Sequence, residues 1–495
     1  MKITYFLFAI AHLFIITLFV PLHAHPSRNQ TNICLMNIDK KVVGDSLMLD
    51  HCELKGEDMQ AVVAYLAAHP DIHILSLEGN LINSEGAKQI ARAMNIEQLG
   101  LGDNVIMDEG AEAIAKNKTF KYISLHKNHI GYQGAVALAA SPSLTHIYLA
   151  ENNIGDKGAI ALAHNNNLKS LWISQNNISD MGAAAFASNS SIQYLGLSDN
   201  NISDDGVIEL AKNVTIYSLF LNNNDGISDA SVIALSSHPG LKELRISHNK
   251  IQNKGAQALA RSRLKILDIS YNMIGDKGAA AFAANETIKE LDLSHNRIQG
   301  TGAAGLANMP RLTSLKLSHN AIGDEGARAL AYAKIKDYHL DYNNVTSIGA
   351  IALAEGIKER TDISLNGNPI GDKGARAIAL NSHFRMVDLA NTKIGNEGAI
   401  ALSQNPGIQM LDLSNNYIGD AGMASFAGNT HLDMLFMSWN KIGNAGAIAI
   451  AENTSMYYVD LSYNHIGQPG LDALKNNTHV KFNVYGQDEN EKHQA

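Results

Sequence analysis

The chain has 495 residues, of which 45 % are hydrophobic and only 6 % aromatic, with 40 glycines and 9 prolines. Small apolar residues must therefore supply much of the burial, which suits thin, stacked layers better than one large core. The formal net charge of −9, from 39 basic and 48 acidic residues without a basic cluster, argues against nucleic acid as a partner because phosphates would be repelled.

The first 24 residues differ from the rest of the chain. Lys2 precedes an apolar run that persists to Leu22, and Ala24 offers a small residue before polar sequence begins at His25. This arrangement predicts a secretory signal peptide over 1–24. An uncleaved membrane anchor is one alternative because the apolar run is long, and a structural segment is another. We expect an exported protein (secreted, periplasmic or at the cell surface) that meets a membrane only through this segment.

Residues 25–70 are expected to form an N-terminal cap, with a long helix starting near Met59. The chain's two cysteines, Cys34 and Cys52, both lie here. In an exported protein they could form one disulfide that staples this end. A buried free thiol at Cys52 is the alternative, because Cys52 follows Leu49 by three residues and so falls in the frame of the repeat that comes next.

One unit recurs along the remaining sequence. It reads Ile288-x-x-Leu291-x-Leu293-x-x-Asn296-x-Ile298, followed by Gly302-Ala303-Ala304-Gly305-Leu306-Ala307. The frame advances sixteen times over the 384 residues between Asn80 and Asn464, or 24 residues per step. Its asparagines are Asn80, Asn104, Asn128, Asn152, Asn176, Asn200, Asn224, Asn249, Asn272, Asn296, Asn320, Asn343, Asn368, Asn416, Asn440 and Asn464, with Thr392 in the remaining unit.

Each position of the unit has a physical reason. The Leu-x-Leu pair alternates with period two, so it predicts a short strand with both leucines buried. The asparagine amide can bond backbone groups of neighbouring turns, and an unsatisfied buried group costs about 1–3 kcal/mol. These asparagines are therefore expected to form a structural ladder. Thr392 can do only part of that work, so its layer is a predicted weak point.

The second half of the unit predicts a short helix. Gly155-Asp156-Lys157-Gly158 is typical of the turn, in which the aspartate is suited to cap the helix that follows. Alanines allow that helix to approach the sheet closely. The unit around Asn224 carries one extra residue, and a distorted outer face is expected there. Units continue to about residue 486, and 487–495 is a polar tail predicted to be disordered.

This pattern resembles the leucine-rich repeat. The resemblance implies an α/β solenoid over 71–486, a horseshoe of about 17–18 units with a parallel concave sheet and short convex helices. The run Gly158-Ala159-Ile160-Ala161-Leu162-Ala163 resembles the GALA-type repeats of bacterial effectors, and is similar to the longer repeats of ribonuclease inhibitor and NOD-like receptors. It implies an exported bacterial protein that meets host proteins. GALA proteins of plant pathogens also carry an F-box, but residues 25–75 show no Leu-Pro-rich helix pair of that kind.

Function is expected at strand positions that point out of the concave face, because the framework does not constrain them. Two groups of aromatic residues lie at or beside these positions. The first is Tyr122, Tyr148, Trp172, Tyr194 and Phe220, and the second is Phe436, Trp439, Tyr458 and Tyr463. Exposed aromatics beside polar residues are typical of binding hot spots, although they could merely cover the sheet.

An acidic zone lies between the aromatic groups and is expected to favour a protein partner with a basic patch. Its members are Asp268, Glu290, Asp292, Asp337, Asp362, Asp388 and Asp412. A solvated face without a partner is the alternative. We expect a monomer that binds protein and uses no cofactor.

No sequence motif indicates catalysis. The chain lacks a phosphate-binding Gly-x-x-x-x-Gly-Lys-Ser/Thr loop, a His-Glu-x-x-His motif and a Gly-x-Ser-x-Gly motif. A structural cell-surface protein is one alternative function. A GTPase activator using Arg245, the only arginine between strand hydrophobics, is the other. His295 and His319 could approach a shared metal, but ordinary surface histidines are the better interpretation because no third ligand is indicated.

Overall fold

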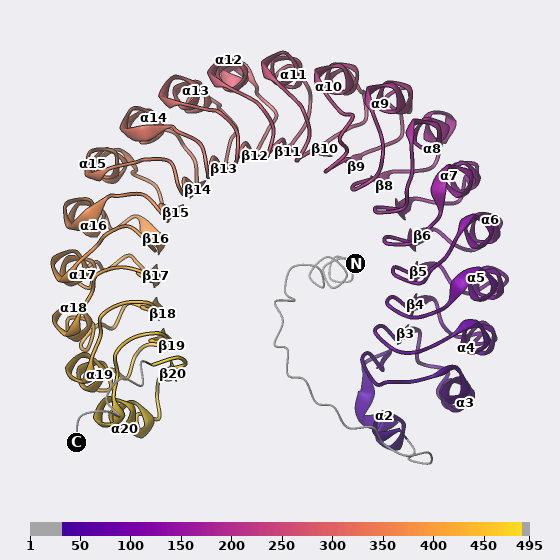
Figure 1. Cartoon of the computed structure of the whole chain (residues 1–495), viewed down its shortest axis with the longest axis horizontal. Coiled ribbons are helices and arrows are strands. Elements are labelled where there is room, and N and C mark those ends of the chain that lie inside the picture. Colours follow the sequence, from indigo (N-terminus) through magenta and orange to yellow (C-terminus); the bar gives the residue numbers. More distant parts are fainter. Residues whose placement is uncertain (1–31, 488–495) are drawn as a thin grey trace.

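The computed structural model describes residues 32–487, which form a single open horseshoe with strands on the inner face and helices on the outer face (Figure 1). This confirms the predicted α/β solenoid. The expected signal peptide at 1–24 lies outside the described residues.

One sheet lines the whole inner face. β1 pairs with β2 antiparallel, and from β2 to β20 each strand runs parallel to the next in chain order. The register shifts only between β15 and β16 among the described parallel pairs. The strands are β1 Val42–Val43, β2 Ser46–Met48, β3 Ile74–Ser76, β4 Gln98–Gly100, β5 Tyr122–Ser124, β6 His146–Tyr148, β7 Ser170–Trp172, β8 Tyr194–Gly196, β9 Ser218–Phe220, β10 Glu243–Arg245, β11 Ile266–Asp268, β12 Glu290–Asp292, β13 Ser314–Lys316, β14 Asp337–His339, β15 Thr361–Ser364, β16 Phe384–Asp388, β17 Met410–Asp412, β18 Met434–Phe436, β19 Tyr458–Asp460 and β20 Lys481–Asn483.

Short helices cover the outer side, and their small residues face the sheet. In α7, Gly158, Ala159 and Leu162 are buried, as predicted from the repeat. The helices are α2 Ile33–Met36, α3 Met59–Ala68, α4 Ser84–Ile90, α5 Met107–Ala115, α6 Tyr132–Ala139, α7 Gly155–Ala163, α8 Asp180–Ala184, α9 Asp204–Leu210, α10 Asp229–Ser236, α11 Asn253–Leu259, α12 Asp276–Ala280, α13 Gly300–Leu306, α14 Gly323–Leu330, α15 Ser347–Gly356, α16 Gly371–Ala379, α17 Asn396–Leu402, α18 Asp420–Ala424, α19 Asn444–Ile450 and α20 Gln468–Asn476. Short 3₁₀ turns are η1 Ile38–Lys41, η2 Gly56–Asp58, η3 Ala185–Ser188 and η4 Ala281–Ala284.

The repeat asparagines join neighbouring layers. Asn104 Nδ2 donates to Leu77 O of the preceding layer at 3.0 Å and to Leu101 O at 3.1 Å, while its Oδ1 accepts from Ile82 N at 2.9 Å. At Thr392 the hydroxyl donates to Leu389 O of its own layer at 2.6 Å and to Asn416 Oδ1 of the next layer at 3.3 Å, but within residues 32–487 it makes no bond to the preceding layer. The Ile370 amide, whose counterparts donate to an asparagine side chain, donates to Asn368 O instead.

The two ends of the ladder are closed differently. Cys52 occupies the first position and is joined to Cys34 by a disulfide, so a free thiol there is wrong. Gln487, expected to start a disordered tail, belongs to the last layer. Its Oε1 accepts from Ile466 N at 3.1 Å and its Nε2 donates to Leu461 O at 2.8 Å, because the longer side chain reaches the groups that an asparagine meets elsewhere.

The turn aspartates act between layers, which corrects the expectation that each caps its own helix. Asp156 lies within the first turn of α7 and cannot reach that helix's free amides. Its Oδ1 accepts from Ser179 N at 2.7 Å and from Gly182 N at 3.1 Å, at the start of α8. Each such aspartate therefore caps the helix of the next layer.

A second asparagine ladder lies at the other end of many layers, and sequence reasoning missed it. Asn213 Nδ2 donates to Phe186 O and Asn189 O of the preceding layer, and its Oδ1 accepts from Thr215 N and Ile216 N. The signal was present, because asparagine recurs thirteen residues after many of the first-ladder positions, for example Asn405, Asn429 and Asn453.

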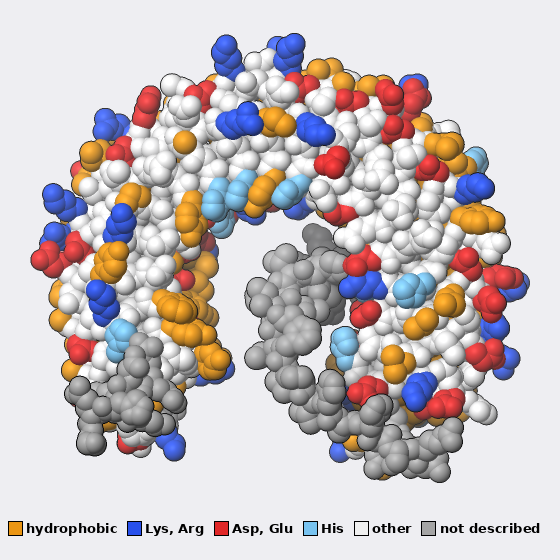
Figure 2. Space-filling view, in the orientation of Figure 1, with side chains coloured by type: hydrophobic (Ala, Val, Ile, Leu, Met, Phe, Trp, Pro, Cys, Tyr) orange, Lys and Arg blue, Asp and Glu red, His pale blue; other side chains and the backbone are white. Residues whose placement is uncertain are grey.

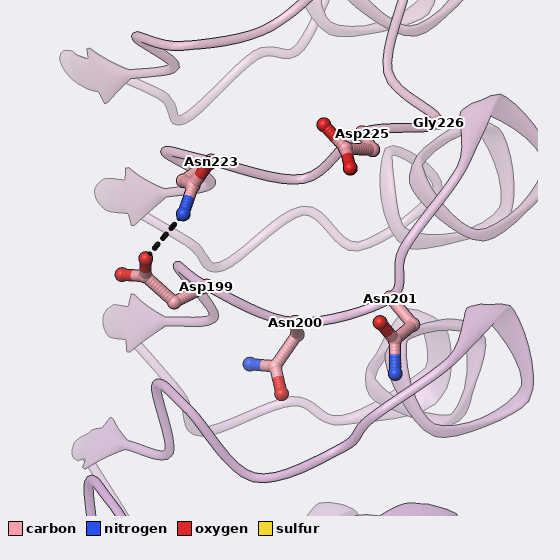
Figure 3. Close-up of a pocket in the computed structure, with 6 residues that line it drawn as sticks. All are labelled: Asp199, Asn200, Asn201, Asn223, Asp225 and Gly226. Atoms are coloured by element: carbon pink, nitrogen blue, oxygen red, sulfur yellow. Dashed lines mark hydrogen bonds between the residues drawn. The ribbon is translucent and has the colours of Figure 1, made fainter.

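The extra residue after Asn224 is absorbed in a loop rather than on the outer face. α10 forms as in other layers, and Ser231, which replaces the usual glycine, is held by Asp204 through its amide at 3.1 Å. The enlarged loop borders a shallow polar depression lined by Asp199, Asn200, Asn201, Asn223, Asp225 and Gly226, in which Asn223 Nδ2 donates to Asp199 Oδ1 at 2.6 Å (Figure 3).

Candidate functional site

The concave face presents two outward residues per strand, on either side of one buried residue. In β6, for example, Ile147 is fully buried while His146 and Tyr148 are only partly covered. Strand register places equivalent residues of successive layers in columns that run along the horseshoe. Side chains far apart in the sequence therefore meet on this face.

Three rings of the first aromatic group form one column. Tyr148 stacks on Trp172 with ring centroids 5.7 Å apart, and Trp172 contacts Phe220 at 4.6 Å. The last contact spans a whole layer, which is possible because Gly196 lies between them. A Cβ at Gly196 would lie 2.4 Å from Trp172 Cε3. Trp172 is further held by its indole N–H, which donates to Ser170 Oγ at 2.9 Å.

The other two members of the group make separate contacts. Tyr122 stacks on His146 at 4.2 Å, and Tyr194 contacts Tyr217 at 6.0 Å. The five predicted residues thus divide into three contacting sets on one face. Burial lowers the pKa of His146 and raises the pKa of Tyr148.

Arg245 continues the column but is engaged within the chain. Its guanidinium lies 5.6 Å from the centre of the Phe220 ring, and its Nε donates to Glu243 Oε1 at 2.9 Å. The arginine is therefore part of the wall of the face, with only part of its donor set left for a ligand.

The acidic zone is not continuous, because basic residues on the same face neutralise part of it. Lys316 Nζ lies 3.8 Å from Asp292, and His339 Nε2 lies 3.2 Å from Asp337. The hydrogen bond from His339 holds the pKa of Asp337 below its usual value, and the same bond raises the pKa of His339. Arg385 forms a bidentate pair with Asp362. Three of the acidic residues expected to face a partner, Asp292, Asp337 and Asp362, are thus paired within the chain.

The aspartates between strand hydrophobics also have a structural role that was not foreseen. Asp412 Oδ1 accepts from Ser414 N at 2.8 Å, and Asp268 and Asp292 bond Ser270 and Ser294 in the same way. Each aspartate thus fastens the turn after its strand, as the recurring Asp-x-Ser sequence indicates in retrospect. One carboxylate oxygen of each aspartate is used in this way.

The second aromatic group lies in the C-terminal arm, with Phe436 and Tyr458 in strands β18 and β19, and Trp439 and Tyr463 at the left-handed position that follows each strand. Phe436 contacts Tyr458 with centroids 5.7 Å apart, Trp439 stacks on Tyr463 at 4.3 Å, and Tyr463 meets Tyr485 edge-on at 5.6 Å. Trp439 is 58 % exposed. Figure 2 shows hydrophobic side chains gathered along the inner edge of this C-terminal arm.

A column of five stacked rings runs along the rim between the two groups. Its ring centroids are 3.8 to 4.5 Å apart, in the order His248, Tyr271, His295, His319 and Tyr342. All five residues have left-handed backbone, with φ between 50° and 55°. Burial lowers the pKa of His295, and the charges of His319 and His248 lower it further.

The stacked histidines do not form a metal centre. A ring nitrogen donates its lone pair in the ring plane, whereas these rings meet face to face. Within residues 32–487, no group of three or more His, Cys, Asp or Glu side chains could hold a metal ion. In the same residues, no helix is long and apolar enough to cross a membrane.

Family models match the chain along most of the solenoid. One leucine-rich-repeat model matches residues 142–202, 262–322 and 382–442, and a second matches 92–115, 116–139, 238–260, 361–379 and 452–475. Together these segments make up more than half of the chain. The chain belongs to the leucine-rich-repeat proteins.

Solved structures are similar to this leucine-rich-repeat protein in architecture alone. An internalin from Listeria monocytogenes is 23 % identical, with a TM-score of 0.39 over 77 % of this chain and 89 % of that one. The ectodomain of the Arabidopsis receptor kinase HAESA, solved with an IDA peptide hormone, is 17 % identical, with a TM-score of 0.42 over 89 % of this chain and 78 % of that one. A PEPR1–AtPEP1 structure is 16 % identical, with a TM-score of 0.43 over 89 % and 68 %. No curated protein sequence matches the chain.

Proposed function

We propose that this leucine-rich-repeat protein is a non-catalytic binding module that engages a partner protein on its concave face. The observation that carries the proposal is the column of Tyr148, Trp172 and Phe220, three large rings in contact and only partly buried. Rigid aromatic side chains at the centre of a curved surface are the residues that most often dominate binding energy. Solenoids use their extended concave faces in this way.

Two features support an exported protein. The Cys34–Cys52 disulfide persists in oxidising compartments, and the apolar N-terminal run has the features of a signal peptide. The resemblance to GALA-type repeats, without a visible F-box, supports a bacterial effector that meets a host protein. We favour this role over GTPase activation because Arg245 is bound to Glu243 and packs on Phe220.

A pull-down with residues 25–495 as bait tests the proposal. The binding variant carries Tyr148→Ala, Trp172→Ala and Phe220→Ala, and the matched control carries Tyr132→Ala, Tyr332→Ala and Tyr417→Ala, which removes three exposed rings away from the aromatic column. We expect a partner that the parent and control capture and the binding variant loses, with a drop in affinity of 100-fold or more because two hot-spot residues at about 2 kcal/mol each suffice for that.

Circular dichroism and thermal melting of each variant show that a lost partner does not reflect a lost fold. Equal capture by all three proteins would move the binding site away from the column. Capture of no specific partner by any of them would favour the structural cell-surface role instead.

A further inference from the structure

The last layers of the concave face carry two adjacent columns of different chemistry. An apolar column places Met386, Met410, Met434 and Tyr458 in register from β16 to β19. Two residues further along the same strands, a mainly acidic column places three aspartates and one phenylalanine in register: Asp388, Asp412, Phe436 and Asp460. We call these eight residues the C-terminal surface.

The carboxylates of this surface have no basic partner. Among residues 32–487, no ion pair joins Asp388, Asp412 or Asp460 to a lysine, arginine or histidine, whereas Asp292 and Asp362 each have one. Arg385, the basic residue of β16 itself, is bound to Asp362 and does not pair with Asp388, Asp412 or Asp460. Burial raises the pKa of both Asp388 and Asp412. The negative charge of the neighbouring Asp412 raises the pKa of Asp388 further. The protein thus holds half-buried like charges together with hydrogen bonds from backbone and hydroxyl groups but without a counter-charge among the described residues.

The methionines of the apolar column are partly exposed, whereas its last member, Tyr458, contacts the Phe436 ring. Met386 is 37 % exposed, and Met410 and Met434 are partly exposed. Methionine side chains are flexible and polarisable, so a methionine column can adapt to different apolar side chains. A purely basic ligand would leave this column uncovered, and a purely apolar ligand would bury the carboxylates without a counter-charge, which is costly.

The spacing of the columns defines what fits between them. Residues two apart on a strand are separated by about 6.6 Å, and four layers span about 14 Å. The strand backbone forms the floor between the columns, because the residue between them, such as Leu411, is buried on the opposite face of the sheet. A segment lying along this floor in extended conformation directs alternate side chains to opposite sides.

We propose that the C-terminal surface docks a partner segment in which apolar and basic side chains alternate, with the apolar ones on the methionine column and the basic ones on the aspartates. The inference rests on the proposed binding function and names the chemistry of the partner at a second place on the same face.

The test uses a labelled octapeptide of alternating Lys and Leu, with Lys–Ser and Glu–Leu octapeptides as controls, and measures binding to residues 25–495 by fluorescence anisotropy. The decisive variant is Asp388→Asn with Asp412→Asn, because an asparagine oxygen can still accept from Ala390 N and Ser414 N. The matched control is Asp268→Asn with Asp292→Asn, which changes the same strand position outside the C-terminal surface.

We expect the parent protein to bind the Lys–Leu peptide and neither control peptide. The decisive variant should bind the Lys–Leu peptide at least about tenfold more weakly at low salt, which corresponds to about 1.4 kcal/mol. The control variant should bind it with unchanged affinity. Equal binding of the Lys–Ser peptide, or equal losses in both aspartate variants, would reduce the effect to general electrostatics and overturn the inference. The Tyr148, Trp172 and Phe220 variant should retain peptide binding. If the pull-down captures a partner through Tyr148, Trp172 and Phe220 but no peptide binds, this inference is overturned and the proposed function stands.

Discussion

The two arms of the horseshoe display rings on the same sheet but hold them differently. In the N-terminal arm, Trp172 is fixed by a hydrogen bond from its indole, by Tyr148 on one side and by Phe220 across a glycine. In the C-terminal arm, methionines stand in register beside aspartates that accept hydrogen bonds within the chain but have no basic partner in the part of the chain that the structure describes. The first arm is a preorganised surface. The second arm keeps carboxylates and apolar side chains partly exposed, which costs folding free energy. For the binding function proposed above, this difference predicts rigid recognition in one arm and adaptable, charge-dependent recognition in the other.

The largest effect is expected from a substitution that displaces the Trp172 ring in the N-terminal arm. Gly196→Ala would place a Cβ 2.4 Å from Trp172 Cε3, so the indole must move. We expect a shift in Trp172 fluorescence, measured with Trp439→Phe present so that one tryptophan remains, together with loss of the captured partner. The cost in unfolding free energy should be about 1–3 kcal/mol.

Gly100→Ala is the control for that substitution. It occupies the same strand position, where the nearest atom to an added Cβ is Ser76 Oγ at 3.2 Å. An unchanged Trp172 spectrum in the Gly196 variant would show that the glycine does not determine the ring's position.

The next effect concerns the ladder beneath the two surfaces. Thr392→Asn should restore the bond from the Ile370 amide and stabilise the layer of β16 by about 1 kcal/mol. The reciprocal change, Asn128→Thr in the N-terminal arm, should remove the bonds to Leu101 O and from Ile106 N and cost about 1–3 kcal/mol. Hydrogen exchange of the amides of Ile370 and Ile106 should show slower and faster exchange, respectively. No change at Ile370 would mean that Asn368 O replaces the missing side chain fully.

The smallest effect is an opposite response of the two arms to pH. The pKa of His146 is lowered by burial, so its contribution to stability is present above the unfolded value and is lost as the pH falls through the folded value. The pKa of Asp412 is raised by burial, so its contribution is present below the unfolded value and is lost as the pH rises through the folded value.

Melting of two variants between pH 4 and 7 separates these contributions. Relative to His146→Gln, the parent should lose stability on acidification. Relative to Asp412→Asn, the parent should lose stability as the pH rises. Parallel curves for either pair would remove that residue from the comparison.

The repeat made the fold predictable because one frame specifies strand, turn and helix together. The outward strand positions were predictable for the same reason, and the column of Tyr148, Trp172 and Phe220 follows from their register. The contact across Gly196 was not predictable, because it depends on what a missing side chain allows. Neutralisation of Asp292 and Asp362 was missed because Lys316 and Arg385 belong to neighbouring strands and had not been weighed with them.

Roles that cross layers were also hidden. Asp156 looks like a cap for its own helix in sequence, yet its partners lie 23 and 26 residues later. The asparagines of the second ladder recur at a regular spacing in the sequence. Their role became clear only from the backbone carbonyls of the previous layer to which they donate hydrogen bonds. Periodicity locates such residues, and only the stacking of layers says which layer each one serves.

The interlayer aspartates also give growth of the solenoid a preferred direction. When a layer is added at the C-terminal edge, the carboxylate that caps its helix is already present on the preceding helix, as Asp156 of α7 is for Ser179 and Gly182. A layer added at the N-terminal edge must begin its helix without that help, and the first turn is the costly step of helix formation. A chain that leaves the ribosome N-terminus first therefore extends, in the layers that follow such an aspartate, toward the side where the capping group of the next helix is already present.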